Sequence, residues 1–284
     1  MKKLYMLFLV SFVFCSVNAQ KINLIVRADD MGSFHAANEA CLDGSKNGII
    51  KSIEVMACCS WLPEAIQMLC VVDTTVDVGV HLMLTSEWIG VKWRPLTNAP
   101  SLVDENGYFY PFLTPRNDLE VNYPCLINQK WDIKEIEAEF RAQIELVKKN
   151  VPRLSHISTH MGSNRLSEEV AQMTERVAKE YGLYINMDNV KRLDTHINIS
   201  DTDEVWEEKF IHAIDNMTEG TYLFVEHPAY NTQEMETVGH IGYMNVGEHR
   251  QKVINLFLSK KVQDVLNKKQ INLISYADWK NMNL

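Results

Sequence analysis

The sequence predicts an α/β protein with a parallel sheet, and two patterns lead to this prediction. Short apolar runs typical of strands recur along the chain, and segments with apolar residues at helical spacing lie between them. Strands that alternate with helices pair in parallel through crossover connections, as they do in an open α/β sheet or an α/β barrel. In both architectures the carboxyl ends of the strands meet on one face, where sites form.

The expected strands are short and apolar. They are 23–26, 52–56, 76–84, 156–159, 183–186, 222–225 and 272–275. The expected helices lie between them, at 36–46, 63–69, 133–150, 167–181, 205–217 and 248–268. In the segment 133–150, Ile136, Phe140, Ile144 and Val147 follow helical spacing with charged residues on the opposite face, so this is the clearest helix.

A region of little periodicity interrupts the alternation at about 87–130. It is rich in Trp, Pro, Tyr, Asn and Gly, and a connection of this length inside a compact domain is commonly a lid or a binding loop. The sequence contains no internal repeat, low-complexity segment or Pro/Ser-rich linker. We therefore expect residues 20–284 to form a single domain that carries this long loop.

The first 19 residues have the composition of a secretory signal peptide. Two lysines precede an apolar stretch, and small residues lead up to Ala19, where we expect cleavage. The stretch is shorter than the roughly 20 residues that a membrane span needs. Phe14 is too large for lipoprotein processing at Cys15. We therefore expect an exported protein, periplasmic or secreted, with no stable membrane anchor.

The formal net charge of −9 and the pI of about 5.5 argue against nucleic acid or an anionic membrane as the main partner. The composition is compatible with a homodimer. The cysteines beyond the signal peptide have neither the spacing of a zinc site nor that of a set of paired disulfides. A single disulfide bond between two of them stays an alternative. These cysteines are Cys41, Cys58, Cys59, Cys70 and Cys125.

The first chemical motif is the adjacent pair Asp29 and Asp30, which ends an apolar run and precedes a turn at Gly32. Neighbouring carboxylates repel each other, so the pair needs a cation, an arginine or a proton. Arg27 shares a strand face with Asp29 and is a candidate partner. Taken alone, Asp-Asp before Gly is more often a turn or helix cap than a metal site.

Three further runs begin as strands, end in turns and carry histidines. His81 lies in the run 78–85, His156 and His160 lie in the run 155–162, and His227 lies in the run 225–230. Because the carboxyl ends of parallel strands converge, these runs and the Asp-Asp turn could meet at one cation.

These residues resemble the YdjC-like family, which includes the chitooligosaccharide deacetylases and is related to the polysaccharide deacetylases. The resemblance spans nearly the whole chain beyond the signal peptide, and the order and spacing of its motifs make it specific. The motifs are Ala-Asp-Asp-x-Gly at 28–32 with Asn38, Gly-x-His-Leu-x-Leu-Thr at 79–85, Trp-Arg-Pro-Leu at 93–96 followed by Ser-Leu-Val at 101–103 and Gly-Tyr-Phe at 107–109, His-x-x-x-His at 156–160, and Glu-His-Pro-x-Tyr at 226–230.

The resemblance implies an irregular (β/α) barrel of the glycoside hydrolase/deacetylase type that holds one divalent metal ion. It implies Asp30, His81 and His160 as the metal ligands, Asp29 as general base and His227 as the acid near the leaving group. Ligands of this kind suit Zn²⁺ or Mg²⁺ and also admit Mn²⁺, Co²⁺ or Ni²⁺. The implied substrate is an oligosaccharide or glycan that loses N-acetyl groups.

The run at 155–162 leaves the choice of ligand open. If it stays a strand, His156 and His160 lie about 13 Å apart and cannot share one ion, whereas a turn would let both bind. We favour His160, which is closer to the strand end, and keep His156 as an alternative. Family members usually carry an Asp where this chain has Ser158, so the role of that acid is lost or transferred, and the substrate range is in doubt.

Five residues are candidates for substrate binding. Trp88 offers an aromatic face to a sugar and Arg94 offers a cation, while the defaults are the loop's own small core and an ordinary surface arginine. Arg27, His156 and Tyr230 complete the set.

Two alternatives to N-deacetylation stay open. One is the hydrolysis of another carbohydrate amide or ester, which the serine at position 158 makes credible. The other is a barrel that binds carbohydrate without turnover. Dependence of product release on Asp29 would separate the enzymes from the binding protein.

Overall fold

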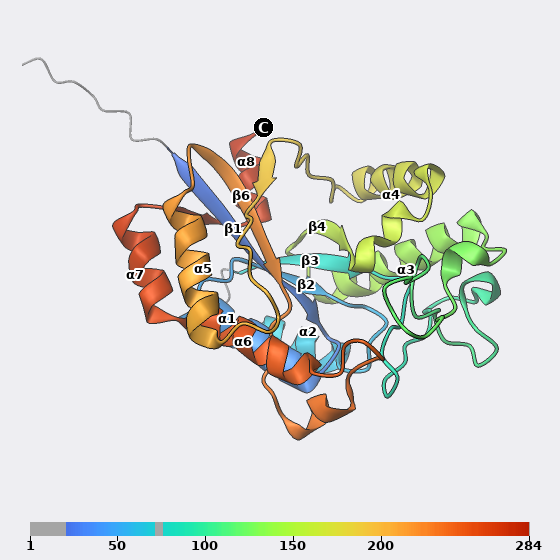
Figure 1. Ribbon diagram of the computed structural model, residues 1–284. Coiled ribbons are helices and arrows are strands. Elements are labelled where there is room, and N and C mark those ends of the chain that lie inside the picture. Colours follow the sequence, from blue (N-terminus) through green and yellow to red (C-terminus); the bar gives the residue numbers. More distant parts are fainter. Residues whose placement is uncertain (1–20, 72–75, 284) are drawn as a thin grey trace, which may run out of the picture.

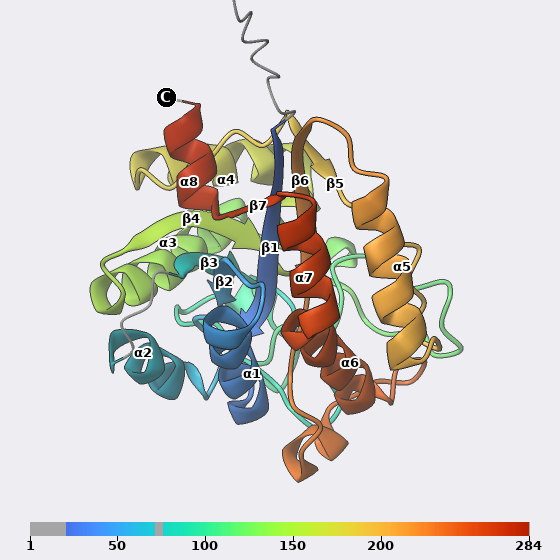
Figure 2. The ribbon, with the colours of Figure 1, turned by 90° about the vertical axis from the view of Figure 1, so that its left-hand side faces the viewer.

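The computed structural model describes residues 21–71 and 76–283, so the expected signal peptide lies outside the described residues. In the described part, the strands form one seven-stranded parallel sheet that curls like part of a barrel, with helices packed on its outside (Figures 1 and 2). The expected α/β class and irregular barrel are confirmed.

The sheet has the order β4-β3-β2-β1-β6-β5, with β7 also paired to β1. The strands are β1 (Ile22–Met31), β2 (Ser52–Val55), β3 (Asp77–Leu82), β4 (Leu154–Thr159), β5 (Val190–Arg192), β6 (Gly220–Glu226) and β7 (Asn272–Ile274). The long strand β1 is central because it pairs with β6, with β7 near its start and with β2 near its end. Its carboxyl end therefore lies in the middle of the sheet.

The helices cover the two flanks of β1 (Figure 2). They are α1 (His35–Asn47), α2 (Leu62–Val71), α3 (Ile133–Asn150), α4 (Glu168–Glu180), α5 (Asp203–Asp215), α6 (Val246–Leu258), α7 (Lys260–Lys268) and α8 (Tyr276–Met282). In Figure 2, α5, α6 and α7 lie on the side of β6, and α2, α3 and α4 lie on the side of β2, β3 and β4. None of the helices in the described ranges is long and apolar enough to span a membrane.

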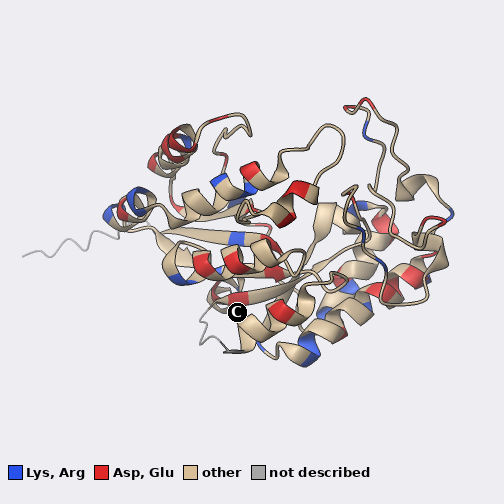
Figure 3. Cartoon of the chain, turned by 90° about the horizontal axis from the view of Figure 1, so that it is seen from below, with Lys and Arg blue, Asp and Glu red and all other residues tan. Residues whose placement is uncertain are grey.

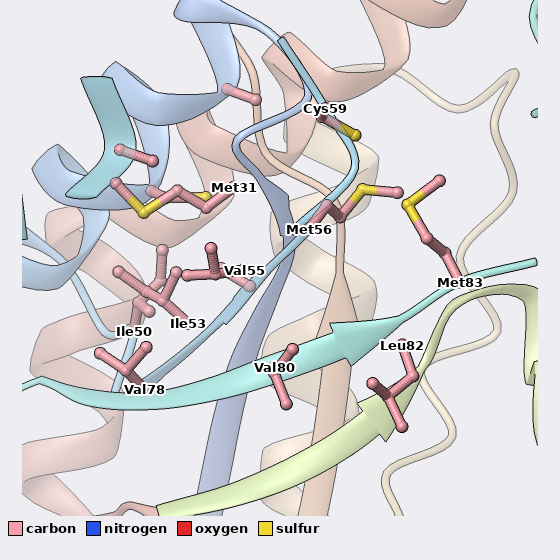
Figure 4. Close-up of a cluster of buried hydrophobic side chains, with 14 of the residues drawn as sticks. Met31, Ile50, Ile53, Val55, Met56, Cys59, Val78, Val80, Leu82 and Met83 are labelled. Atoms are coloured by element: carbon pink, nitrogen blue, oxygen red, sulfur yellow. The ribbon is translucent and has the colours of Figure 1, made fainter. Parts of the chain in front are cut away.

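The core lies between the sheet and the helices. Branched side chains of neighbouring strands, such as Ile53, Val78 and Val80, are completely buried in it (Figure 4). Burying one such side chain contributes about 1.5–3 kcal/mol. Positive and negative residues are interspersed along the helices, as Figure 3 shows. All five cysteines of the described part are unpaired.

The strand expected at 183–186 is not formed, and the sheet is extended by β5 instead. Leu183 belongs to the end of α4, where its N–H donates to Ala178 O at 2.8 Å and Gly182 has a φ of +73°. A left-handed glycine followed by a buried apolar residue is a common helix ending. The apolar character of Leu183 thus serves a helix cap.

The C-terminal region also differs from expectation in its helix boundaries. The helix expected at 248–268 is two helices, because Ser259 interrupts it and accepts a hydrogen bond from Val262 N as the N-cap of α7. Helix α8 was not expected. It follows β7 directly and begins with a capping box formed by Ser275 and Asp278.

The long loop contains only two short 3₁₀ turns, η1 (Pro100–Leu102) and η2 (Leu126–Asn128), and runs beside α3 (Figure 1, teal to green). Buried Glu139 of α3 accepts hydrogen bonds from Leu96 N at 3.1 Å and Thr97 N at 2.9 Å. Charge-assisted bonds of this kind are among the stronger ones in proteins. The loop is therefore fixed against the domain by its polar backbone groups.

Candidate metal centre and the cavity above it

The strand ends bring the expected acid and histidine residues together. Asp29 and Asp30 lie at the end of β1, His81 lies near the end of β3, His160 directly follows β4, and His227 directly follows β6. These residues are far apart in the sequence, and the curl of the sheet places them around one point.

The two aspartates face the same imidazole although they are adjacent in β1. In a regular strand, adjacent side chains point to opposite faces. Asp30 has a φ of +73°, and the pairing of β1 with β2 shifts register between Ala28 and Met31. As a result, His81 Nε2 lies 3.6 Å from Asp29 Oδ2 and 3.7 Å from Asp30 Oδ1. The irregularity therefore aims both carboxylates at one centre.

The turn after Asp30 holds this backbone in place. Gly32, with a φ of +98°, donates its N–H to Asn38 Oδ1 at 2.6 Å, and Ser33 Oγ donates to the carbonyl of Asp30 at 2.6 Å. A Cβ at Gly32 would lie 3.0 Å from Met56 O, so the turn needs glycine. The Gly and Asn of the sequence motif thus support the aspartate.

Asp30, His81 and His160 could hold a metal ion. Each offers one ligand atom within 4.8 Å of the others, and all three side chains are buried. Asp30 Oδ1 lies 3.3 Å from His160 Nδ1 and has no hydrogen-bond partner among the described residues. A buried carboxylate oxygen without a donor beside two imidazole nitrogens fits a divalent cation, and three protein ligands leave further coordination positions open.

Two arginines compensate the negative charge of the aspartates. Arg27 contacts Asp29 through both Nε and Nη2 at 2.7 Å, which confirms the expected ion pair. Arg250 of α6 donates from Nη2 to Asp30 Oδ2 at 2.7 Å. Burial would raise the pKa of Asp30, but Arg250 and the neighbouring histidines outweigh it and hold that pKa well below its usual range.

The two candidate histidine ligands have opposite electrostatic surroundings. Burial and the charge of His160 hold the pKa of His81 well below its usual range, so this ring is neutral. Burial opposes the charge of His160, but Glu87, whose Oε2 lies 3.2 Å from His160 Nε2, and Asp30 raise its pKa to about 10. A cation bound by His160 would therefore displace a proton.

His227 lies at the edge of the centre. Its ring is partly exposed, and its Nε2 lies 4.0 Å from Asp29 Oδ2. Burial would lower the pKa of His227, but the carboxylates of Asp30, Glu226 and Asp29 outweigh burial and raise it. The surrounding carboxylates therefore favour the protonated form of this ring.

His156 lies away from the three-residue cluster. His160 directly follows β4, and the chain turns just after it, where Met161 and Gly162 have left-handed backbones. His156 instead contacts Glu54, with Nε2 2.5 Å from Oε1, and stacks on Tyr276 at 4.1 Å. The cluster that could hold a metal ion therefore contains His160 and not His156.

A cavity of about 510 Å³ opens above the cluster. Asp30, His160 and His227 form part of its lining. Its walls combine charged and aromatic side chains, and Trp88 of the long loop stacks on His240 of the β6–α6 connection at 5.8 Å between ring centroids. Two segments that are distant in the sequence thus enclose the space next to the candidate metal centre.

The five candidate substrate-binding residues separate into two groups. Trp88 lines the cavity, whereas Arg94 is exposed and lies over the Tyr108 ring. Tyr230 donates its hydroxyl proton to Asp43, and Arg27 and His156 are occupied by the internal contacts described above. We therefore assign no substrate contact to Arg94, Tyr230, Arg27 and His156.

Sequence reasoning did not single out Arg250, Glu87 or Glu54. Arg250 shares a helical face with the apolar residues Val253 and Phe257, and a lone charge on such a face was a detectable signal. Glu54 is likewise a single acid in an apolar strand. Glu87 carries no such local signal, because only the fold brings the long loop to His160.

Fold and site define an α/β protein with an acid–histidine centre at the carboxyl ends of its strands. The chain belongs to the YdjC-like protein family, whose profile matches residues 23–268.

Similar curated proteins include the carbohydrate deacetylase of Clostridium beijerinckii, 28% identical over 269 residues that cover 90% of this chain and 100% of the relative. Carbohydrate deacetylase 2 of Listeria innocua is 25% identical over 268 residues, which cover 90% of this chain and 98% of that protein. A crystal structure from Enterococcus faecalis V583, described as a candidate cellobiose-phosphate cleavage protein, has a TM-score of 0.71 at 20% identity and covers 92% of this chain and 99% of that one. This last likeness shows the shared fold.

Proposed function

We propose that this protein is a divalent-metal-dependent hydrolase that removes N-acetyl groups from amino-sugar oligosaccharides or glycans. The observation that carries the proposal is the buried Asp30–His81–His160 cluster with Asp29 beside it, of which Asp30 and His160 line a cavity. The names of the similar carbohydrate deacetylases support the reaction class and the substrate class.

Asp30, His81 and His160 would hold the ion, which suits Zn²⁺ by ligand type and also admits Mg²⁺, Mn²⁺, Co²⁺ or Ni²⁺. When bound, a divalent ion supplies Lewis-acid chemistry that polarises the acetyl carbonyl and favours ionised water. Asp29 is the general base, because it borders the cluster and Arg27 fixes its orientation through two contacts.

His227 is the general acid of the proposed reaction. The carboxylates of Asp30, Glu226 and Asp29 raise the pKa of His227 and so favour its protonated form, and the ring lines the cavity next to Asp29. It can therefore donate a proton to the sugar nitrogen as the C–N bond breaks. This places the base and the acid on the ends of β1 and β6.

The direct test is acetate release from a panel of N-acetylated oligosaccharides by metal-loaded protein, with Asp29→Asn as the matched variant. We expect release from the wild type, and loss of release in the variant with its fold and bound metal retained. No release across the panel from protein shown to contain metal would overturn the proposal in favour of another carbohydrate acyl substrate or of binding without turnover.

We also propose that the chain is exported to the periplasm or the medium, on the basis of its first 19 residues. Mass spectrometry of the protein from its native host should show a mature chain that begins at Gln20. An intact N-terminus in protein recovered from the cytoplasm would contradict export.

A further inference from the structure

Glu54 is a completely buried carboxylate that contacts none of the three candidate metal ligands directly. It lies in β2, one strand away from His81 and two strands away from Ser158. Charged side chains are almost never fully buried unless they are paired. The contacts of Glu54 lead toward the candidate metal centre.

One oxygen of Glu54 is connected to His81 through a serine hydroxyl. Ser158 Oγ donates its proton to Glu54 Oε2, and the same Oγ lies 2.7 Å from His81 Nδ1. A serine hydroxyl has a single proton to give, so its oxygen must accept the proton of His81 Nδ1. His81 then carries its proton on Nδ1, and the lone pair of Nε2 is free.

The free nitrogen is the one that faces the cluster, since His81 Nε2 lies 3.7 Å from Asp30 Oδ1. We propose that Glu54 acts through Ser158 as a positioning residue, fixing His81 in the tautomer and orientation that a metal ion requires. The inference rests on the proposed metal-dependent function. Metal-binding histidines commonly donate their second N–H to an acceptor that is itself held in place.

The sheet register builds this connection. Glu54 of β2 pairs with Gly79 of β3, which pairs with His156 of β4, and His81 pairs with Ser158 two residues further on. A Cβ at Gly79 would lie 2.4 Å from Glu54 Oε2 and 2.6 Å from His156 Nε2. Glycine therefore leaves the space in which Glu54 reaches across β3.

The second oxygen of Glu54 is occupied as well, which fixes the carboxylate. Glu54 Oε1 lies 2.5 Å from Nε2 of His156, whose Nδ1 lies 2.6 Å from Ser155 Oγ. His156, a candidate ligand by sequence, thus orients the acid behind His81. The neutral Ser158 connects His81 to a carboxylate that lies one strand away from His81.

The test compares metal affinity and the tautomer of His81 in the full mature chain. Affinities for Zn²⁺ are measured by chelator competition for the wild type, Glu54→Gln, Ser158→Ala and the control Ser45→Ala, which removes a hydroxyl that donates to Leu42 O within α1. Nitrogen-15 NMR of the metal-free protein reports which imidazole nitrogen of His81 carries the proton.

We expect Ser158→Ala and Glu54→Gln to weaken Zn²⁺ binding roughly 10- to 100-fold and Ser45→Ala to leave it unchanged. The double variant Glu54→Gln/Ser158→Asp, which moves the carboxylate directly onto His81, should recover most of the affinity. A general loss of structure would not be rescued in this way. Thermal unfolding checks that each variant is folded. If Glu54→Gln does not fold, the tautomer of His81 in the wild type decides whether Glu54 has this role.

Wild-type affinity in both Ser158→Ala and Glu54→Gln, or a proton on Nε2 of His81 in the wild type, would overturn this role for Glu54. A double variant no better than the single ones would do the same. Absence of Zn²⁺ binding by the wild type would instead overturn the proposed metal-dependent function, while the tautomer measurement would still judge the connection to Glu54.

Discussion

The two oxygens of Asp30 have different partners, and this difference suits a carboxylate that must be stable before a metal binds. Oδ2 accepts from Arg250, while Oδ1 faces His160 and His81. Arg250 is almost completely buried and comes from α6, at the far end of the sequence. It supplies the positive charge that keeps Asp30 ionised in the interior.

Replacing Arg250 with methionine should therefore destabilise the metal-free protein by about 3–5 kcal/mol, because a buried carboxylate loses its cation. Urea unfolding in the presence of a chelator measures the change, and saturating metal should recover part of it. Arg176→Met is the matched control, since Arg176 is half exposed and water screens its ion pairs. Equal losses in the two variants would contradict this account of Arg250.

His249 gives the stability of the protein a pH dependence that is independent of the metal ligands. The half-buried ring packs on Trp206 and accepts the hydroxyl proton of Tyr243. Burial, together with the charge of Arg250, lowers the pKa of His249 from 6.5 to about 4. The unfolded chain therefore binds this proton more tightly than the folded protein does.

The contribution of His249 to stability should be fully present above pH 6.5 and should fall as the pH drops toward 4. The loss is at most about 3 kcal/mol, and smaller because the ring is partly solvated. Urea unfolding of the wild type and His249→Gln between these pH values measures it. The wild-type curve should be steeper, and two parallel curves would exclude His249 as the source.

The residues of the site differ in how far the sequence could predict them. Strand convergence brought the Asp-Asp turn and the histidine runs to one candidate centre, and the family resemblance selected Asp30, His81 and His160 among them as the ligands. Arg250 and Glu87 become part of the site only through tertiary packing. The local sequence contains no record of which helix or loop will face a given strand end.

At the level of elements, the long loop depends on one buried acid of α3. Glu139 accepts hydrogen bonds from the backbone N–H groups of Leu96 and Thr97, from the Thr97 hydroxyl and from the Gln143 side chain. These donors would have no carboxylate partner if Glu139 were shortened. The loop carries Glu87 and Trp88 into the cavity, so its anchor also supports the site.

Glu139→Ala should lower the free energy of unfolding by about 2–4 kcal/mol, because several buried donors lose a charged acceptor. Denaturant unfolding measures the loss. Glu208→Ala, at an exposed position of α5, should change stability by no more than about 0.5 kcal/mol. A loss for Glu139→Ala as small as that of the control would show that the loop does not depend on this acid.

The prediction of helices and strands succeeded where a continuous apolar face marks the element. It failed where the same type of residue can belong to a strand or to the end of a helix. The helix expected at 133–150 matches α3 because its apolar face is continuous. Leu183 resembled part of a strand because it is apolar, but its burial completes a helix end. Ser259 divides the last long helix through a single cap that hydrophobic periodicity does not detect.

At the scale of the whole molecule, the candidate ligands connect separate parts of the sheet. Asp30 ends β1, His81 belongs to β3 and His160 follows β4, with β2 between the first two strands. A bound ion would therefore tie the centre of the sheet to its β4 edge. Such an ion binds the folded protein but finds no preformed site in the unfolded chain.

Metal should consequently stabilise the whole molecule by mass action. At a free metal concentration of 100 times Kd, the free energy of unfolding should rise by about 2.7 kcal/mol, and a chelator should reverse the increase. Calorimetric or urea unfolding with Zn²⁺, with Mg²⁺ and with EDTA measures the effect and ranks the metals. Asp30→Ala should abolish the increase, whereas Asp264→Ala, at an exposed position of α7, should retain it in full. An increase that persists in Asp30→Ala would place the stabilising ion somewhere other than between β1, β3 and β4.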